Sequence, residues 1–229
     1  MKNILLTCLV VFSVTMLSSG QDCSFYYPQL AGARLVYQHY DKKLKPAGKS
    51  SHEVIAYNKT ATGAIAVIKV ESFDEKDKLL GESTIEVKCE TGVFYFDMKS
   101  FISPQTLNAY KDMDIVVTTD NLEMPHLLKA GEKLKDGSLI MDISTNGFRI
   151  MTISVLVTDR VVEGQESITT PAGTFSCYKI NEKVTSKVGL TVVSNTSEWY
   201  CENVGLVKSE TYSGDGALAS GTELIELNR

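Results

Sequence analysis

Short runs of alternating apolar and polar residues, separated by turn residues, cover most of the chain after its first twenty residues. Arg34–Tyr40 is rich in β-branched and aromatic residues, and the runs Glu53–Tyr57 and Ala64–Val70 are split by Thr62-Gly63. Runs of this length and composition, bounded by glycine-containing turns, are typical of β-strands. We count about a dozen of them.

One tight hairpin is marked by Glu90-Thr91-Gly92, which connects Thr84–Cys89 to Val93–Met98. The glycine can supply the positive φ angle that a short hairpin turn needs. The two flanking runs are therefore predicted to be antiparallel neighbours.

A second hairpin is marked by Asn146-Gly147, between Leu139–Ser144 and Phe148–Val157. Both turn residues tolerate positive φ, which makes this pair a strong hairpin signal. In the second arm, Phe148, Ile150 and Leu156 share one face, and Met151, Ile153, Val155 and Val157 share the other. Apolar residues on both faces predict a strand inside a packed sandwich or barrel wall.

Ser103-Pro104 is the best helix start in the chain, because serine can cap a helix and proline suits its first position. We expect one short helix over residues 104–111, before a strand at Ile115–Thr118. The sequence shows no heptads, no fixed repeat and no low-complexity linker. The predicted fold is all-β: a strongly curved or barrel-like antiparallel sheet of about a dozen strands with one short helix, in a single domain over residues 21–229.

Residues 1–20 are predicted to be a signal peptide. Lys2 precedes an apolar stretch, Ile4–Leu17, and Ser18-Ser19-Gly20 offers small residues for cleavage before Gln21. A retained membrane anchor is the alternative. We expect an exported protein, periplasmic or outer-membrane-associated, with no integral span after cleavage. Asp22 argues against lipid attachment at Cys23, since a small residue is needed there.

The mature chain is mildly acidic. The whole sequence has 23 basic and 28 acidic side chains. Cleavage after Gly20 removes only Lys2 from this count, so 22 bases face 28 acids and the net charge is −6. This balance argues against a nucleic acid or an anionic membrane surface as the partner.

Four cysteines remain in the mature chain, which permits two disulfides in an exported protein. Cys177 and Cys201 lie in strand-like segments that could be neighbours, and we favour this pair, which leaves Cys23 with Cys89. Such a loop closure would stabilise the fold by about 3 kcal/mol in the chain-entropy model. Four buried free thiols are the alternative.

No catalytic motif is present in the sequence. His39, His52 and His126 lie far apart and lack metal-ligand spacing. Asp112-Met113-Asp114 could hold a calcium ion but lacks the rest of a calcium loop, and a solvated helix end explains it better. We therefore predict no catalytic residue, no metal and no cofactor.

Aromatic side chains are the remaining candidates for a ligand pocket or an interface. The candidates are Phe94, Phe96, Phe148, Trp199 and Tyr200. Plain core packing is the alternative for all of them.

Several segments resemble the TapB-like family of exported proteins from Bacteroides-type bacteria. The clearest are Thr170–Phe175 followed by Cys177 and Lys179, then Glu198–Tyr200 and Val204–Tyr212. Gly32-Ala33, Cys89–Met98 and Val162–Ile168 are similar too, so the resemblance spans nearly the whole mature chain. Cys201 departs from the pattern, where a small residue is expected. The resemblance implies contact with a tetratricopeptide-repeat protein and brings no catalytic residues.

These observations favour a non-enzymatic exported binding protein that contacts another cell-envelope protein through a sheet face or edge. The alternative is a carrier of an apolar ligand or lipid in a half-open barrel, with a cavity lined by residues such as Phe94, Phe96, Phe148 and Leu156. An enzyme is the third hypothesis. It would require Asp112, Asp114 and a histidine to converge in one cleft.

Overall fold

The structure is a computed structural model that describes residues 23–229. The predicted signal peptide, residues 1–20, lies outside the described residues. Thirteen strands form one sheet, in which every pair of neighbours is antiparallel, in the order β6-β8-β9-β10-β11-β12-β13-β1-β2-β3-β4-β5-β7. The prediction of a barrel-like, all-β fold with about a dozen strands is confirmed.

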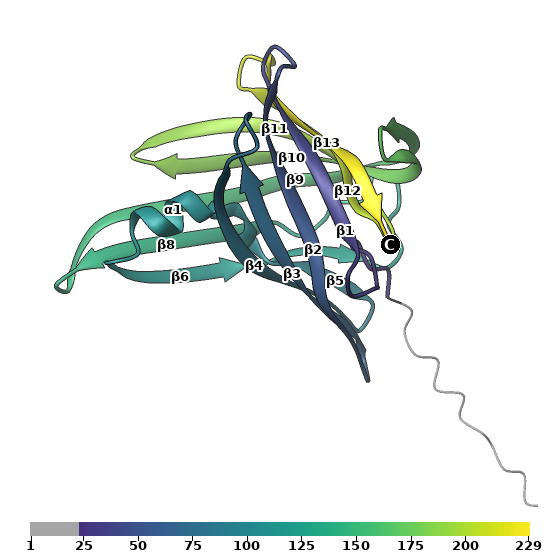
Figure 1. Cartoon of the computed structure of the whole chain (residues 1–229), viewed down its shortest axis with the longest axis horizontal. Coiled ribbons are helices and arrows are strands. Elements are labelled where there is room, and N and C mark those ends of the chain that lie inside the picture. The colour runs from purple at the N-terminus through teal and green to yellow at the C-terminus, as the bar shows by residue number, and fades with distance from the viewer. Residues whose placement is uncertain (1–22) are drawn as a thin grey trace, which may run out of the picture.

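The strands differ widely in length, and the two longest are consecutive. The bounds are β1 (Arg34–Asp41), β2 (Pro46–Thr60), β3 (Gly63–Phe73), β4 (Leu79–Glu90), β5 (Val93–Phe96), β6 (Asp114–Asp120), β7 (Leu122–Pro125), β8 (Gly137–Thr145), β9 (Phe148–Thr170), β10 (Gly173–Val188), β11 (Leu190–Cys201), β12 (Gly205–Ser213) and β13 (Leu218–Asn228). Figure 1 shows β1 to β4 running steeply across the long strands β8 to β11, so the sheet is strongly curved.

The two ends of the sheet meet at a seam, which we define as residues 120–123. Strands β6 and β7 are the terminal strands of the sheet, yet only Asn121 separates them in sequence. Across the seam, Lys135 Nζ donates to Asp120 and to Glu123, at 2.9 Å each. The sheet is therefore nearly closed.

Both predicted hairpin turns are present. Thr91 and Gly92 have φ angles of 50° and 81°, and Asn146 and Gly147 have 50° and 79°. Two residues with positive φ match the twist of the flanking strands. These turns pair β4 with β5 and β8 with β9.

The predicted helix start is confirmed as well. Helix α1 (Pro104–Ala109) is capped by Ser103, whose side chain accepts a hydrogen bond from the amide of Thr106. The helix ends two residues earlier than expected, and a 3₁₀ turn, η1 (Met98–Phe101), precedes it. Figure 1 shows α1 between β4 and the long strands, on the concave side of the sheet. None of the described helices is long and apolar enough to cross a membrane.

Strand β9 lies in the wall of the barrel-like sheet, as predicted, but only one of its two apolar faces is buried. The residues Met151, Ile153, Val155 and Val157 pack in a core cluster with β8. Phe148, Ile150 and Leu156, on the other face, are 77%, 52% and 44% exposed. The other face is exposed because none of the elements within residues 23–229 covers this part of the outside of the sheet.

One of the two predicted disulfides is present in the structure. Cys23 and Cys89 are bonded, with a Cα–Cα distance of 6.0 Å, which ties the segment before β1 to the end of β4. Cys177 and Cys201 are free, although the register that pairs Tyr178 with Tyr200 places them opposite each other. The expected bond between them is therefore absent from this structure. The two thiols contact each other as a hydrogen-bonded pair, and this contact, with burial, raises the pKa of Cys177.

Candidate functional site

The inward face of strands β2, β3 and β4 changes from apolar to polar along the strands. The register aligns Val54, Ile68 and Ile85 in one buried layer. Because side chains alternate between the two faces of a sheet, every second residue of a strand points to the same face. The next layer holds His52, Val70 and Ser83, and the one after it holds Ser50 and Ser72. The core therefore ends where serine and histidine replace aliphatic residues.

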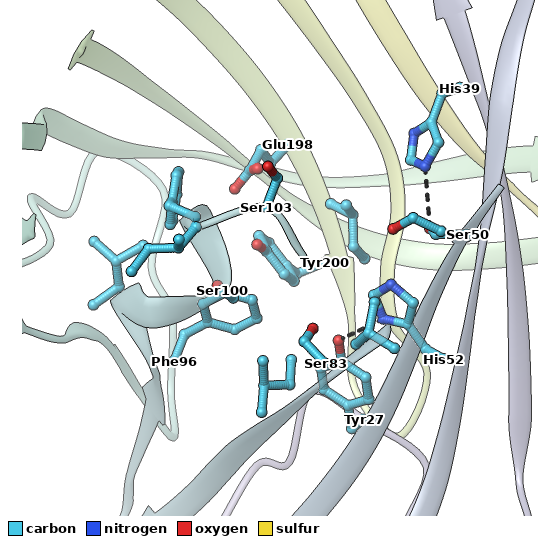
Figure 2. A pocket seen from close by; sticks show the side chains of 17 residues that line it. Tyr27, His39, Ser50, His52, Ser83, Phe96, Ser100, Ser103, Glu198 and Tyr200 are labelled. Atoms are coloured by element: carbon cyan, nitrogen blue, oxygen red, sulfur yellow. Dashed lines mark hydrogen bonds between the residues drawn. The ribbon is translucent and has the colours of Figure 1, made fainter. Parts of the chain in front are cut away.

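A cavity of about 360 Å³, which we call cavity 1, opens at this change. Its walls come from strands far apart in sequence, together with η1. The lining residues are Tyr27, His39, Ser50, His52, Val70, Ser72, Ser83, Ile85, Phe96, Ser100, Phe101, Ile102, Ser103, Leu122, Glu198, Tyr200 and Leu206. Figure 2 shows Glu198, Tyr200, Ser83 and Tyr27 arranged around one space.

The two histidines of cavity 1 are neutral near pH 7. His39 Nε2 bonds Ser50 Oγ and His52 Nδ1 bonds Tyr27 OH, both at 3.1 Å (Figure 2). Burial lowers the pKa of His39, and burial with the nearby His39 lowers the pKa of His52 to about 4. Imidazoles that stay uncharged can both donate and accept hydrogen bonds.

Glu198 is the acidic group of cavity 1, and it holds its proton near neutrality. Burial, together with the negative charge of Glu182, raises its pKa to about 8, and Tyr200 and Arg160 offset this only in part. Glu198 reaches the cavity from β11, beside Tyr200. A protonated carboxyl can donate a hydrogen bond as well as accept one.

A second cavity, of about 420 Å³, lies on the other side of η1 and α1; we call it cavity 2. Strands β8, β9 and β10 form its floor, which is mainly aliphatic. The lining residues are Phe101, Ile102, Gln105, Thr106, Ala109, Tyr110, Leu139, Met141, Ile153, Val155, Ser186 and Val188. Phe101 and Ile102 line both cavities, so the two adjoin at this point.

The aromatic residues singled out in the sequence lie in different places. Phe96 and Tyr200 line cavity 1. Phe94 is fully buried in the larger core cluster, where its ring packs edge-on against Phe25. Phe148 is exposed beside the β8–β9 turn, and lines neither cavity.

Trp199 lies on the face of β11 opposite Tyr200, since neighbouring residues of a strand alternate. The ammonium groups of Lys179 and Lys208 lie 5.4 and 5.2 Å from its ring centroid. Its indole N–H donates to Glu166. Trp199 is only 6% exposed and belongs to the larger core cluster, so it packs in the core and lines neither cavity.

The polar residues of cavity 1 were not identified as a group from the sequence. His39 and His52 were noted singly, and Glu198 only as part of the family pattern. The available signal was weak: Ser50, Ser72 and Ser83 sit at inward positions of strands whose other inward residues are apolar. Among residues 23–229, no group of three or more metal-ligating side chains is close enough to hold an ion.

Comparison with known proteins places the chain in a family. The DUF3108-like family profile matches residues 30–224, which is most of the sequence. The chain belongs to the DUF3108-like family. No curated protein matches it.

Two crystal structures share the fold. One is a protein of Bacteroides fragilis, provisionally described as exported and as having a YmcC-like fold. It is 23% identical, with a TM-score of 0.76, over 90% of this chain and 100% of that one. The other is a protein of Parabacteroides distasonis, provisionally described as a lipoprotein. It is 27% identical, with a TM-score of 0.77, over 91% and 100% of the two chains. The chain thus resembles two proteins of the Bacteroides group that are provisionally described as an exported protein and as a lipoprotein.

Proposed function

We propose that this protein is an exported, non-enzymatic binding protein that carries an apolar or amphipathic molecule. The molecule would lie in the trough that cavities 1 and 2 form together on the concave side of the sheet. The observation that carries this proposal is the junction of cavities 1 and 2 at Phe101 and Ile102. Small-molecule sites are concave and mostly apolar, with a few polar groups, and each cavity falls within their usual range of about 300–1,000 Å³. Export is supported by the descriptions of the two Bacteroides-group structures.

Native mass spectrometry of the protein purified from its own host tests this function. We expect a mass above that of the bare chain, which returns to the bare mass after organic extraction. Ser186→Trp, which fills cavity 2, should lower the bound fraction. Lys187→Trp is the matched control, because Lys187 is exposed on the opposite face of β10. The bare chain mass alone, in every preparation, would refute the proposal.

A reaction at the Ser50–His39 pair is the competing hypothesis within the same cavity. Hydrolytic Ser-His sites orient the imidazole with a third group, commonly a carboxylate. Here His39 Nδ1 bonds the hydroxyl of Thr222, at 3.1 Å. We propose that the pair is structural. Hydrolysis of a chromogenic ester that disappears in Ser50→Ala would overturn this view.

Contact with an envelope protein is a second candidate function, supported by the free edge of β6. Among the described strands, β6 pairs only with β8; it contains no proline, and Val116 at its middle is 64% exposed. An open edge can accept a strand from a partner. The TapB-like resemblance makes a tetratricopeptide-repeat protein the partner to test first.

Pull-down from envelope extract would test this contact. We expect Val116→Lys to abolish capture of the repeat protein, because lysine on an edge strand discourages further pairing. Ile140→Lys, on the neighbouring strand β8, is the control and should retain capture. Unchanged capture by both variants would exclude the β6 edge.

A further inference from the structure

The two cavities differ in the chemistry of their walls. Cavity 1 carries five serines, two tyrosines, two histidines and one glutamate among its lining residues. The sheet side of cavity 2 is aliphatic apart from Ser186, and its outer end opens at Val188, near the exposed Leu190. A single molecule that occupies both would therefore have one polar and one apolar end.

The polar end of the trough is rich in hydroxyl groups and poor in charge. Among the described residues that line cavities 1 and 2, none is lysine or arginine. A phosphate or sulfonate inside would lose its hydration without gaining a charge-assisted partner, which is costly. Arg160 is a buried cation whose charge acts on Glu198, but it is already paired with Glu182.

The geometry points to a specific class of ligand: we propose a single-chain amphiphile with an uncharged, hydroxyl-bearing head. The head lies in cavity 1 against Glu198, Tyr200 and the serine hydroxyls. The chain passes Phe101 and Ile102 into cavity 2 and leaves toward Val188. This inference rests on the proposed carrier function and adds the head-group specificity.

The protonation of the site agrees with this assignment. Burial and Glu182 raise the pKa of Glu198 to about 8, and burial lowers the pKa of His52 to about 4. The groups that face Glu198 are Glu182 on β10, Arg160 on β9 and Tyr200 on its own strand. At pH 7 the polar wall therefore presents neutral donors and acceptors, which suit hydroxyl groups.

Competition against a neutral fluorescent dye, phenylnaphthylamine, tests the specificity on the full mature chain. The competitors are monooleoylglycerol and oleoyl lysophosphatidate, which share one chain and differ in head charge. At pH 7 we expect the glycerol ester to displace the dye at a concentration lower by about tenfold or more. Equal potency, or a preference for the phosphate, would overturn the inference.

A variant that adds a cation should narrow or abolish this difference in potency. Ser83→Lys places an ammonium group at the wall of cavity 1, and is expected to improve lysophosphatidate binding about tenfold. Leu80→Lys adds the same charge at an exposed position of β4 that does not line the cavity, and should leave the difference unchanged. Equal effects of both variants would show that general electrostatic attraction controls binding, and would refute the proposed site.

Tyr200→Phe removes one hydroxyl and keeps the ring. We expect a severalfold loss of monooleoylglycerol affinity with unchanged affinity for the dye, which lacks hydroxyl groups. An equal loss of affinity for both, in a variant that unfolds at the wild-type urea concentration, would place Tyr200 outside head-group recognition. If neither the dye nor either amphiphile binds the wild-type protein, the carrier function itself fails; if all bind equally, only the head-group assignment fails.

Discussion

The guanidinium of Arg160 donates to Glu182 Oε2 at 3.2 Å, and the two side chains are only 2% and 1% exposed. The same guanidinium donates to the carbonyls of Glu123 and Lys135, at 3.1 and 2.7 Å. Arg160 therefore links β9 and β10 to the seam where the sheet nearly closes. The buried pair thus ties β9 and β10 to β7, one of the two terminal strands of the sheet.

Replacing Arg160 should strongly destabilise the protein. Arg160→Met keeps most of the side-chain volume but leaves Glu182 buried without its partner, and it removes the donors of two carbonyls. Such a loss typically costs about 3–5 kcal/mol in the free energy of unfolding. Urea denaturation would measure it. Lys49→Ala is the control, because it breaks an exposed pair with Asp77 and should cost about 1 kcal/mol or less.

Local signals predicted the turns and the helix start, whereas the site depended on long-range pairing. Asn146-Gly147 and Ser103 act through their own backbone angles and caps, so a short window of sequence was enough. Cavity 1 unites His52, Ser83 and Glu198 from strands whose register the sequence does not specify. Phe148 was misplaced for a related reason. Its apolar character could not show that its face of the sheet is uncovered.

Loss of the Cys23–Cys89 disulfide should destabilise the fold. The two cysteines are 66 residues apart in sequence. Closing a loop of this length stabilises the fold by about 4 kcal/mol in the chain-entropy model, somewhat more than the ~3 kcal/mol expected from the sequence. The paired variant Cys23→Ser/Cys89→Ser should show this loss in thermal and urea unfolding. Cys201→Ser, which alters a free thiol at a half-buried position, should change stability much less.

Gly63 permits the close approach of β3 to β4 beside this disulfide. A Cβ at this position would lie 1.9 Å from the carbonyl oxygen of Cys89. Because backbone must move to relieve the clash, Gly63→Ala should cost about 1–3 kcal/mol in the free energy of unfolding. Gly214→Ala is the matched control, since its Cβ would meet nothing closer than 3.9 Å. Equal stability of the two variants would contradict this close approach of β3 to β4.

The raised pKa of Glu198 should make the protein less stable as the pH rises. In the unfolded chain this carboxyl loses its proton near its ordinary pKa of 4.5, but in the folded protein only near 8. The folded state therefore binds more protons between these values, and stability falls with pH by at most about 1.4 kcal/mol per unit. His52 has the opposite effect on stability below its ordinary pKa of 6.5. There the unfolded chain binds the proton at a higher pH than the folded protein does, so stability rises with pH.

The window from pH 6.5 to 8 isolates the effect of Glu198 from that of His52. Urea unfolding at intervals across it should show a decline for the wild-type protein. Glu198→Gln keeps the hydrogen-bonding shape without the charge, so its curve should be flatter and should lie above the wild type at pH 8.5. Glu75→Gln, in an exposed turn, should give a curve parallel to the wild type. Parallel curves for Glu198→Gln and the wild type would show that the carboxyl ionises normally, and cavity 1 would then be charged at neutral pH.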